Sequence, residues 1–241
     1  MPEQPEVSVI LPVYNQSDHI TQVVEAYRSV LDRLKHSFEI ILVVNASRDG
    51  SLEVCRRLAA ASTQVRVLHG EAPGWGRAVR DGISAARGQL IAYANSARTS
   101  PYTLGLLVML ALANPGCILK ANRRLRYPFL RRLGSLLYNL ECRTLFGLAV
   151  WDVNGTPKVF NRDLISALDL REDGDLIDLE FVVKCRQLNL QVLEVPIVSA
   201  ARHGGDSTTG VASALKLYDG ALRLWLAMRR SIPADDERTG A

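Results

Sequence analysis

The stretch that decides the fold runs from residue 7 to residue 15 and reads Val-Ser-Val-Ile-Leu-Pro-Val-Tyr-Asn. Val7 to Leu11 is a mostly apolar run with β-branched side chains, and Pro12 ends it. Such a run predicts a buried β-strand. The turn Pro12 to Asn15 then stands at the carboxyl end of that strand.

Three further strands of this kind follow, and a segment with helical spacing separates each from the next. We expect strands at 38–44, 65–68 and 88–94, and helices at about 18–34, 51–61 and 77–86. This β-α-β-α-β-α-β order predicts an α/β fold whose mostly parallel sheet has helices on both faces. Ligands of such sheets bind beyond the carboxyl ends of the strands. Those ends are the turns 12–15, 45–51 and 95–100.

The second half of the chain has a different texture, with six basic residues and no acidic one between positions 120 and 132. We expect helices at about 127–148, 175–188 and 211–230, a strand and turn at 150–160, and a strand at 191–197. No linker separates the halves. The sequence therefore predicts one domain over residues 1–231 and a disordered polar tail at 232–241.

Composition excludes several classes of protein. The 241 residues are 48% hydrophobic and 22% charged, with a net charge of +4, which excludes a disordered chain, a collagen and a coiled coil. One short basic cluster falls short of the usual footprint of a nucleic-acid-binding protein. The charge-free run 99–119 is broken by Pro and Gly, so we interpret it as a core helix and not a membrane span.

The four cysteines, at 55, 117, 142 and 185, include no Cys-x-x-Cys pair. We interpret them as thiols of a reducing compartment, buried in apolar segments, and expect no zinc site. The first residues lack the basic and apolar pattern of a signal peptide. Together these features predict a cytoplasmic protein.

These motifs resemble family-2 glycosyltransferases of the GT-A fold. Residues 9–15 are similar to their opening strand and turn, 45–51 to their second turn, and 74–78 to their third element. In the second half, residues 152–160, 194–197 and 202–207 resemble the polyprenyl-phosphate branch, which includes dolichol-phosphate mannosyltransferases. The resemblance implies a nucleotide-sugar half at about 7–115 and an acceptor half at about 116–231.

The resemblance also implies three groups of site residues. The expected nucleotide-sugar-binding residues are Pro12, Tyr14, Asn15, Asn45, Ser47, Asp49, Gly76, Arg80, Asn95 and Ala97. The expected residues of the reaction centre are Asp152, Lys158 and Arg202, of which Asp152 would position the acceptor or sugar. The expected ligands of a lipid acceptor phosphate are Arg124, Arg131, Ser135 and Ser207.

The chain departs from the family at the expected metal site. Relatives carry Asp-x-Asp where this chain has Asn95-Ser96-Ala97, and a pair of aspartates where it has Val44 and Asn45. The first pair holds Mg²⁺ or Mn²⁺ in relatives, and such hard cations prefer carboxylate oxygens. With those ligands absent, Arg202, Lys158, Arg77 and Arg80 are the candidates to stabilise the diphosphate. Two interpretations stay open: a metal-independent transferase, or a catalytically degenerate binding or regulatory protein.

Several residues have a purely structural alternative. Tyr14 can close a loop, Asp49 can cap a helix, and Gly74 and Gly76 can simply start one. Asp178 and Glu180 are two residues apart on a helix, so we predict that at most one points inward. A dinucleotide-binding dehydrogenase is disfavoured, because no Gly-x-Gly-x-x-Gly follows the first strand.

The basic stretch also has two interpretations. It can be an ordinary solvated face, or it can bind an anionic lipid headgroup, since apolar residues are interleaved with the arginines. The last helix has the same ambiguity between core packing and a membrane surface. The second interpretation predicts a peripheral protein at the inner face of the membrane.

Overall fold

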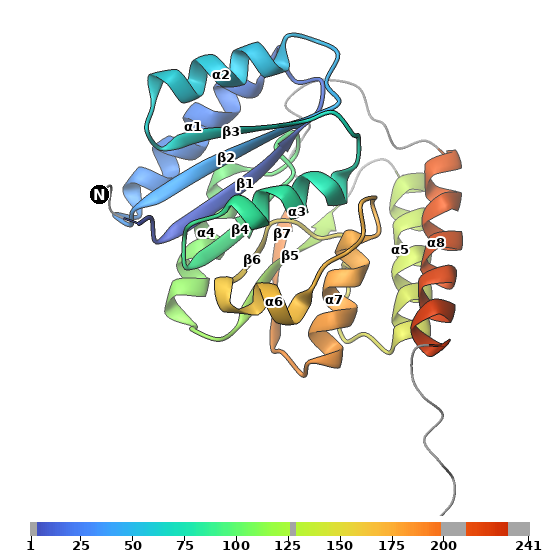
Figure 1. The fold of residues 1–241 in the computed structure, drawn as a ribbon. Helices are drawn as coiled ribbons and strands as arrows, with labels where there is room; N and C mark the ends of the chain where they lie inside the picture. The colour runs from blue at the N-terminus through green and yellow to red at the C-terminus, as the bar shows by residue number, and fades with distance from the viewer. Residues whose placement is uncertain (1–3, 126–128, 199–210, 231–241) are drawn as a thin grey trace, which may run out of the picture.

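The computed structural model describes residues 4–125, 129–198 and 211–230, and the side chains of these residues except 124, 125, 129–132, 211–215 and 230. A seven-stranded sheet in the order β3-β2-β1-β4-β6-β5-β7 forms its centre (Figure 1). The strands are β1 Val7–Val13, β2 Phe38–Asn45, β3 Val65–Gly70, β4 Leu90–Tyr93, β5 Ile118–Leu125, β6 Lys158–Asn161 and β7 Val192–Val198. Only β6 runs antiparallel to its neighbours, β4 and β5. The mostly parallel sheet is therefore confirmed.

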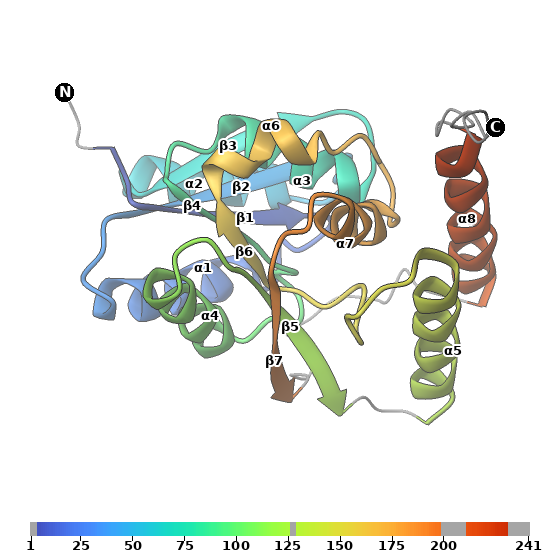
Figure 2. The ribbon, with the colours of Figure 1, turned by 90° about the horizontal axis from the view of Figure 1, so that it is seen from below.

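Helices cover both faces of the sheet, as expected. They are α1 Ile20–Arg33, α2 Ser51–Ala61, α3 Trp75–Ala85, α4 Pro101–Ala113, α5 Phe129–Phe146, α6 Ile165–Leu168, α7 Ile177–Gln187 and α8 Val211–Arg230, and a short 3₁₀ turn, Arg162–Leu164, precedes α6. Helices α1, α2 and α4 pack in one hydrophobic cluster, and α3, α6 and α7 pack in the other. Helices α5 and α8 stand side by side at one end of the molecule, beyond α7 (Figures 1 and 2).

The opening strand shows why the sequence selects this architecture. All seven residues of β1 are buried, as a strand covered on both faces requires. Val9 and Leu11 face the cluster that contains α1 and α4, whereas Ile10 faces the cluster that contains α3. This alternation places a helical layer on each side of β1.

Strand register brings the important turns to one edge of the sheet. Val13 at the end of β1 pairs with Val44 near the end of β2. Tyr93, the last residue of β4, pairs with Lys158, the first residue of β6, and Lys158 pairs in turn with Lys120 of β5. The turns after β1, β2 and β4 and the segment before β6 therefore lie along the same edge.

The structure corrects some expected boundaries. The strand expected within 150–160 is confined to β6, and residues 150–157 form turns and loop instead. Helix α3 begins at Trp75, two residues early, after Gly74 with its φ of 140°. Helix α1 begins at Ile20, and no side chain caps it. The run 99–119 forms α4 and the start of β5, and no helix in the described part of the chain combines the length and apolar content needed to cross a bilayer.

Three of the four cysteines are buried, as expected. Cys55, Cys142 and Cys185 are buried, whereas Cys117 is partly exposed, and all four are free thiols. Burial raises the pKa of Cys55, Cys142 and Cys185 to about 12 in each case.

Candidate functional site

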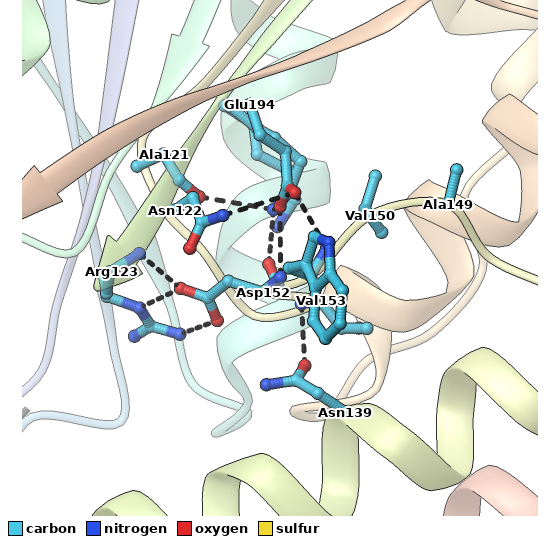
Figure 3. Close-up of polar contacts among 12 residues, drawn as sticks. Ala121, Asn122, Arg123, Asn139, Ala149, Val150, Asp152, Val153 and Glu194 are labelled. Carbon is cyan, nitrogen blue, oxygen red and sulfur yellow. Dashed lines mark hydrogen bonds and ion pairs between the residues drawn. The ribbon is translucent and has the colours of Figure 1, made fainter. Parts of the chain in front are cut away.

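The turn that carries Asp152 is held by side chains from distant elements (Figure 3). Glu194 of β7 accepts hydrogen bonds from the backbone N–H groups of Trp151, at 2.8 Å, and Asp152, at 3.1 Å. Asn139 of α5 accepts one from the N–H of Val153 at 2.9 Å. Three consecutive backbone donors thus have side-chain acceptors, so β7 and α5 fix the shape of this turn.

A buried lysine binds both the Asp152 turn and the glutamate that holds it. The side chain of Lys120 has no exposed surface, and its Nζ donates to Glu194 Oε1 at 2.9 Å and to the carbonyl of Asp152. A buried ammonium needs such partners, because an unpaired charge is costly away from water. Gly155 lets the turn approach β5 closely, since a Cβ there would lie 1.9 Å from the carbonyl oxygen of Ala121.

The carboxylate of Asp152 binds the guanidinium of Arg123. Its Oδ2 accepts from Arg123 Nε at 2.7 Å and from the Arg123 backbone N–H at 3.0 Å, and its Oδ1 accepts from Nη2 at 2.8 Å. This two-oxygen geometry is the strong form of a carboxylate–arginine pair. Arg123 thus engages both carboxylate oxygens, so the pair fixes the orientation of the Asp152 side chain.

A second buried pair lies beside the first. The side chain of Lys158 has no exposed surface, and its Nζ binds Asp178 of α7. Burial lowers the pKa of Lys158 to about 8, although Asp178 opposes the shift. Asp178 also accepts from the Tyr93 hydroxyl at 2.9 Å and from Trp75 Nε1 at 3.2 Å. A ligand could contact the Lys158 ammonium only if this enclosure opened.

The prediction that one of Asp178 and Glu180 is solvated was wrong, because their exposed fractions are 5% and 4%. Glu180 accepts hydrogen bonds from the backbone N–H groups of Arg171 and Glu172, and it pairs with Lys184. The start of α7 is enclosed by the sheet on one side and by the preceding loop on the other, so both faces are interior.

Hydrogen bonds join the first two turns of the expected donor site. The backbone N–H of Asn15 donates to Ser47 Oγ at 3.2 Å, and the N–H of Arg48 donates to Asn15 Oδ1 at 2.9 Å. Tyr14 is 43% exposed and Pro12 is buried. The structure thus brings Pro12, Tyr14, Asn15 and Ser47 together at the carboxyl edge of the sheet.

Asp49 binds backbone N–H groups beside the start of α2, although Gly50 is the N-cap residue of that helix and makes no side-chain cap. Its carboxylate accepts from the backbone N–H groups of Ser17 and Ser51, both at 3.0 Å. Burial would raise the pKa of Asp49, but the hydrogen bonds from Ser51 and Ser17 outweigh it and lower the pKa to about 2. Its nucleotide-binding role stays a prediction.

Asn45 and Gly76 both serve the segment around the start of α3. Asn45 Nδ2 donates to the carbonyl of Gly74 at 2.8 Å. The N–H of Gly76 donates to the carbonyl of Gly174 at 3.2 Å, and a Cβ on Gly76 would lie 2.3 Å from the carbonyl oxygen of Glu172. Close approach of the loop before α7 therefore accounts for this glycine without a ligand.

The same loop engages the arginines of α3. Arg77 Nη2 and Arg80 Nη1 each lie 2.5 Å from a carboxylate oxygen of Asp173. Arg80 Nη1 also donates to the carbonyl of Arg171 at 3.0 Å. The diphosphate-binding role of Arg80 stays a prediction, and it would require competition with Asp173.

The side chains at 95–97 do not suit a hard cation. Ser96 Oγ lies 2.8 Å from the carbonyl oxygen of Pro12 and 2.9 Å from Gln16 Oε1, and only 1% of Ser96 is exposed. Asn95 Oδ1 accepts from the N–H of Ala97 at 3.1 Å, and Ala97 offers only a methyl group. The residues that the structure describes contain no group of three or more His, Cys, Asp or Glu side chains arranged to hold a metal. The position therefore offers no carboxylate oxygen, the ligand that Mg²⁺ or Mn²⁺ prefers, and its amide and hydroxyl oxygens are already engaged in hydrogen bonds.

The expected acceptor residues are only partly described. Ser135 lies one turn before Asn139 on α5, and its Oγ accepts from Asn139 Nδ2 at 3.4 Å, which connects it to the Asp152 turn. Arg202 and Ser207 lie outside the described residues, as do the side chains of Arg124 and Arg131.

Comparison with known proteins decides the family. The family model described as glycosyl transferase family 2 matches residues 8–166. The chain belongs to this family. The match begins in β1 and ends in α6, so it spans the turns after β1, β2 and β4, the Asp152 turn and β6 of this family-2 glycosyltransferase.

Several curated relatives are named as undecaprenyl-phosphate sugar transferases. The chain is 26% identical over 205 residues to an undecaprenyl-phosphate 4-deoxy-4-formamido-L-arabinose transferase of Pseudomonas fluorescens, covering 83% of this chain and 59% of the relative. It is 26% identical over 218 residues to the protein of the same name from Aeromonas hydrophila, covering 88% of this chain and 66% of the relative. The chain thus spans about two thirds or less of the length of these relatives.

A solved structure shares the fold. Glucosyl-3-phosphoglycerate synthase from Mycobacterium tuberculosis, crystallised with Mn²⁺, UDP and phosphoglyceric acid, aligns with a TM-score of 0.73 at 19% identity. The alignment covers 96% of this chain and 80% of the synthase. The expected GT-A-like fold is confirmed.

Proposed function

We propose that this protein transfers a sugar from a nucleoside-diphosphate sugar to a lipid phosphate of the polyprenyl type. The observation that carries the proposal is the built turn around Asp152, with three consecutive N–H groups bound by Glu194 and Asn139. This turn holds the Asp152–Arg123 pair at the same edge of the sheet as the expected donor-binding turns after β1, β2 and β4. The names of the undecaprenyl-phosphate relatives support the same acceptor class.

In the proposed reaction, an oxygen of the acceptor phosphate forms a bond to the anomeric carbon of the sugar. The bond from that carbon to the diphosphate breaks, and the nucleoside diphosphate leaves with the electron pair. A phosphate monoester has its second pKa near ~6, so the nucleophile is already ionised near neutral pH. No strong base is required, which agrees with an Asp152 neutralised by Arg123.

We further propose that the transfer is metal-independent. The leaving diphosphate must still be stabilised as charge develops on it. The side chains of Asn95, Ser96 and Ala97 supply no carboxylate for a cation, so cationic side chains take this role. Arg202 is the first candidate, on its sequence position alone, whereas the ammonium of Lys158 is enclosed.

A leucine stripe on α5 supports docking at a membrane that contains the acceptor. Leu133, Leu136, Leu137 and Leu140 are 42–57% exposed and recur at helical spacing along one face. Asn139, on the same helix, is 8% exposed and binds the Asp152 turn. An exposed apolar stripe suits the interfacial region of a bilayer, and this orientation would bring the reaction centre close to the lipid phosphate.

The alternative is a catalytically degenerate protein that binds a nucleotide sugar or a lipid without turning it over. The absence of both family aspartate pairs favours it.

The first test is calorimetric titration with UDP, GDP and their common sugar conjugates, each with Mg²⁺, with Mn²⁺ and with EDTA. Metal-independent transfer predicts binding that survives EDTA. Binding that disappears in EDTA would contradict metal independence, and no binding of any nucleotide would contradict the proposed donor.

A further inference from the structure

The buried carboxylate of Asp178 joins three segments of the chain that lie far apart in sequence. Its Oδ1 accepts from the Tyr93 hydroxyl at 2.9 Å and binds Lys158 Nζ, and its Oδ2 accepts from Trp75 Nε1 at 3.2 Å. Trp75 is the first residue of α3, Tyr93 the last of β4, and Lys158 the first of β6. One side chain thus links the ends of three elements.

Two of those segments bracket the expected donor site. Tyr93 stands two residues before Asn95. Trp75 follows Gly74, whose carbonyl accepts from Asn45 Nδ2 at 2.8 Å. Movement of Trp75 would therefore shift the neighbouring Gly74 carbonyl, to which the Asn45 side chain of the second turn donates. Asp178 thus connects the end of β4, through Tyr93, to the turn at Gly74 that binds Asn45, through Trp75.

The surroundings make this link rigid. The rings of Trp75 and Tyr93 pack edge to face with centroids 6.5 Å apart, and Tyr93 packs on Phe181 in the same way at 6.1 Å. Asp178 is only 5% exposed and Lys158 is fully buried, so water cannot readily replace the hydrogen bonds. A lost partner in such a place leaves a buried polar group unsatisfied.

A second contact from the same region holds the α3 turn. Glu180 binds the backbone N–H groups of Arg171 and Glu172. Further along that loop, the carbonyls of Asp173 and Gly174 accept from the N–H groups of Arg77 and Gly76. The first turn of α3 is therefore fixed through its backbone by the loop and through the Trp75 side chain by Asp178.

We infer that Asp178 is a positioning residue that sets the geometry of the donor half by holding Trp75 against the end of β4. The inference rests on the proposed function. Asp178 touches no substrate in this assignment; it acts through Trp75 and Tyr93. Its loss should therefore weaken nucleotide binding more than it weakens the use of the lipid phosphate.

The test compares Asp178→Asn with a matched buried carboxylate at the other edge of the sheet. Glu39, at the start of β2, is 4% exposed and binds Ser8 Oγ, Arg66 Nη1 and the Arg87 N–H, each at 2.7 Å. Both Asp178→Asn and Glu39→Gln remove a buried charge from a network, so both should lower the thermal unfolding temperature. Only Asp178→Asn should raise the Kd for a nucleoside diphosphate, by about tenfold.

The measurement is calorimetric titration of the full chain with UDP and with GDP. Wild-type binding, weakened by Asp178→Asn and unchanged by Glu39→Gln, is the expected result. Equal weakening by both variants, or none by Asp178→Asn, overturns the inference and leaves the proposed function standing. No binding by the wild type overturns both.

Tyr93→Phe keeps the test decisive if Asp178→Asn does not fold. This variant retains the ring that packs on Trp75 and Phe181 and removes one hydrogen bond to Asp178. A raised Kd for the same nucleotide, with a raised KM for the donor and an unchanged KM for the lipid phosphate, is expected. An unchanged Kd in Tyr93→Phe overturns the inference.

Discussion

Lys120 and Lys158 are register partners on β5 and β6, and neither side chain has any exposed surface. Each ammonium binds a carboxylate from a later element, Glu194 of β7 for Lys120 and Asp178 of α7 for Lys158. The two pairs hold different segments, since Glu194 binds the Asp152 turn and Asp178 binds Trp75. Two like charges side by side in the interior make each counter-charge indispensable.

Lys158→Met should destabilise the fold by about 3–5 kcal/mol, because Asp178 would remain buried without its ion partner. The double variant Lys158→Met with Asp178→Asn should recover part of this loss, since no buried charge is then left unpaired. Urea unfolding of the wild type and the three variants measures the effect. A double variant whose loss equals the sum of the two single losses would contradict the pairing.

Glu194→Gln should lower the rate of sugar transfer and also the stability, by about 3 kcal/mol or more. The substitution removes the charge that pairs with Lys120 and weakens acceptance from the Trp151 and Asp152 N–H groups. Glu39→Gln is again the control, since it removes a buried carboxylate far from the turn. If the two variants lose the same free energy of unfolding and their transfer rates fall equally, Glu194 has no specific role in transfer.

The stability that Asp49 contributes should disappear at acid pH. Hydrogen bonds lower its folded pKa from 3.8 to about 2, so the unfolded chain binds the proton more readily and the contribution is present above the unfolded pKa. The stability difference between wild type and Asp49→Asn should be constant above pH 3.8 and shrink as the pH falls toward about 2. A difference that does not change across this range would show that the Asp49 hydrogen bonds do not lower its pKa.

The leucine stripe of α5 predicts binding to lipid vesicles. Leu136→Glu and Leu140→Glu should each reduce cosedimentation with vesicles containing anionic phospholipid, since a charge placed in the apolar interface is costly. Leu106→Glu on α4 is the matched control, because Leu106 is 47% exposed on a different face. Equal loss of vesicle binding in all three variants would count against α5 as the docking face.

Sequence patterns predicted the parts of this protein that depend on local order. The buried run of β1 and the alternation of strands and helices sufficed for the α/β sheet. The motif at 152–160 indicated a turn followed by a strand, which the structure contains, whereas its place at a reaction centre stays a prediction. The burial of both Asp178 and Glu180 was not predicted, because helical periodicity considers one buried face and α7 has two. A stronger signal for buried carboxylates was present in the sequence. Lys120 and Lys158 each stand within an apolar run, and a buried ammonium needs an anionic partner.

Other features depended on contacts between distant segments and could not be read locally. The role of Gly76 is set by the loop before α7, about a hundred residues later, whose carbonyls approach it. The N–H groups of the Asp152 turn find acceptors on β7 and α5. Nothing in the spacing of Glu194 or Asn139 indicates these partners.

The most direct test of the proposed function is detection of its product. The protein is incubated with the nucleotide sugars that it binds and with a polyprenyl phosphate, in EDTA and in Mn²⁺, and the lipid fraction is analysed by mass spectrometry. A glycosylated lipid phosphate is expected in both conditions, and it should be lost in Asp152→Asn. Nucleotide binding without any lipid product in either condition would contradict it and identify a binding protein that has lost catalysis.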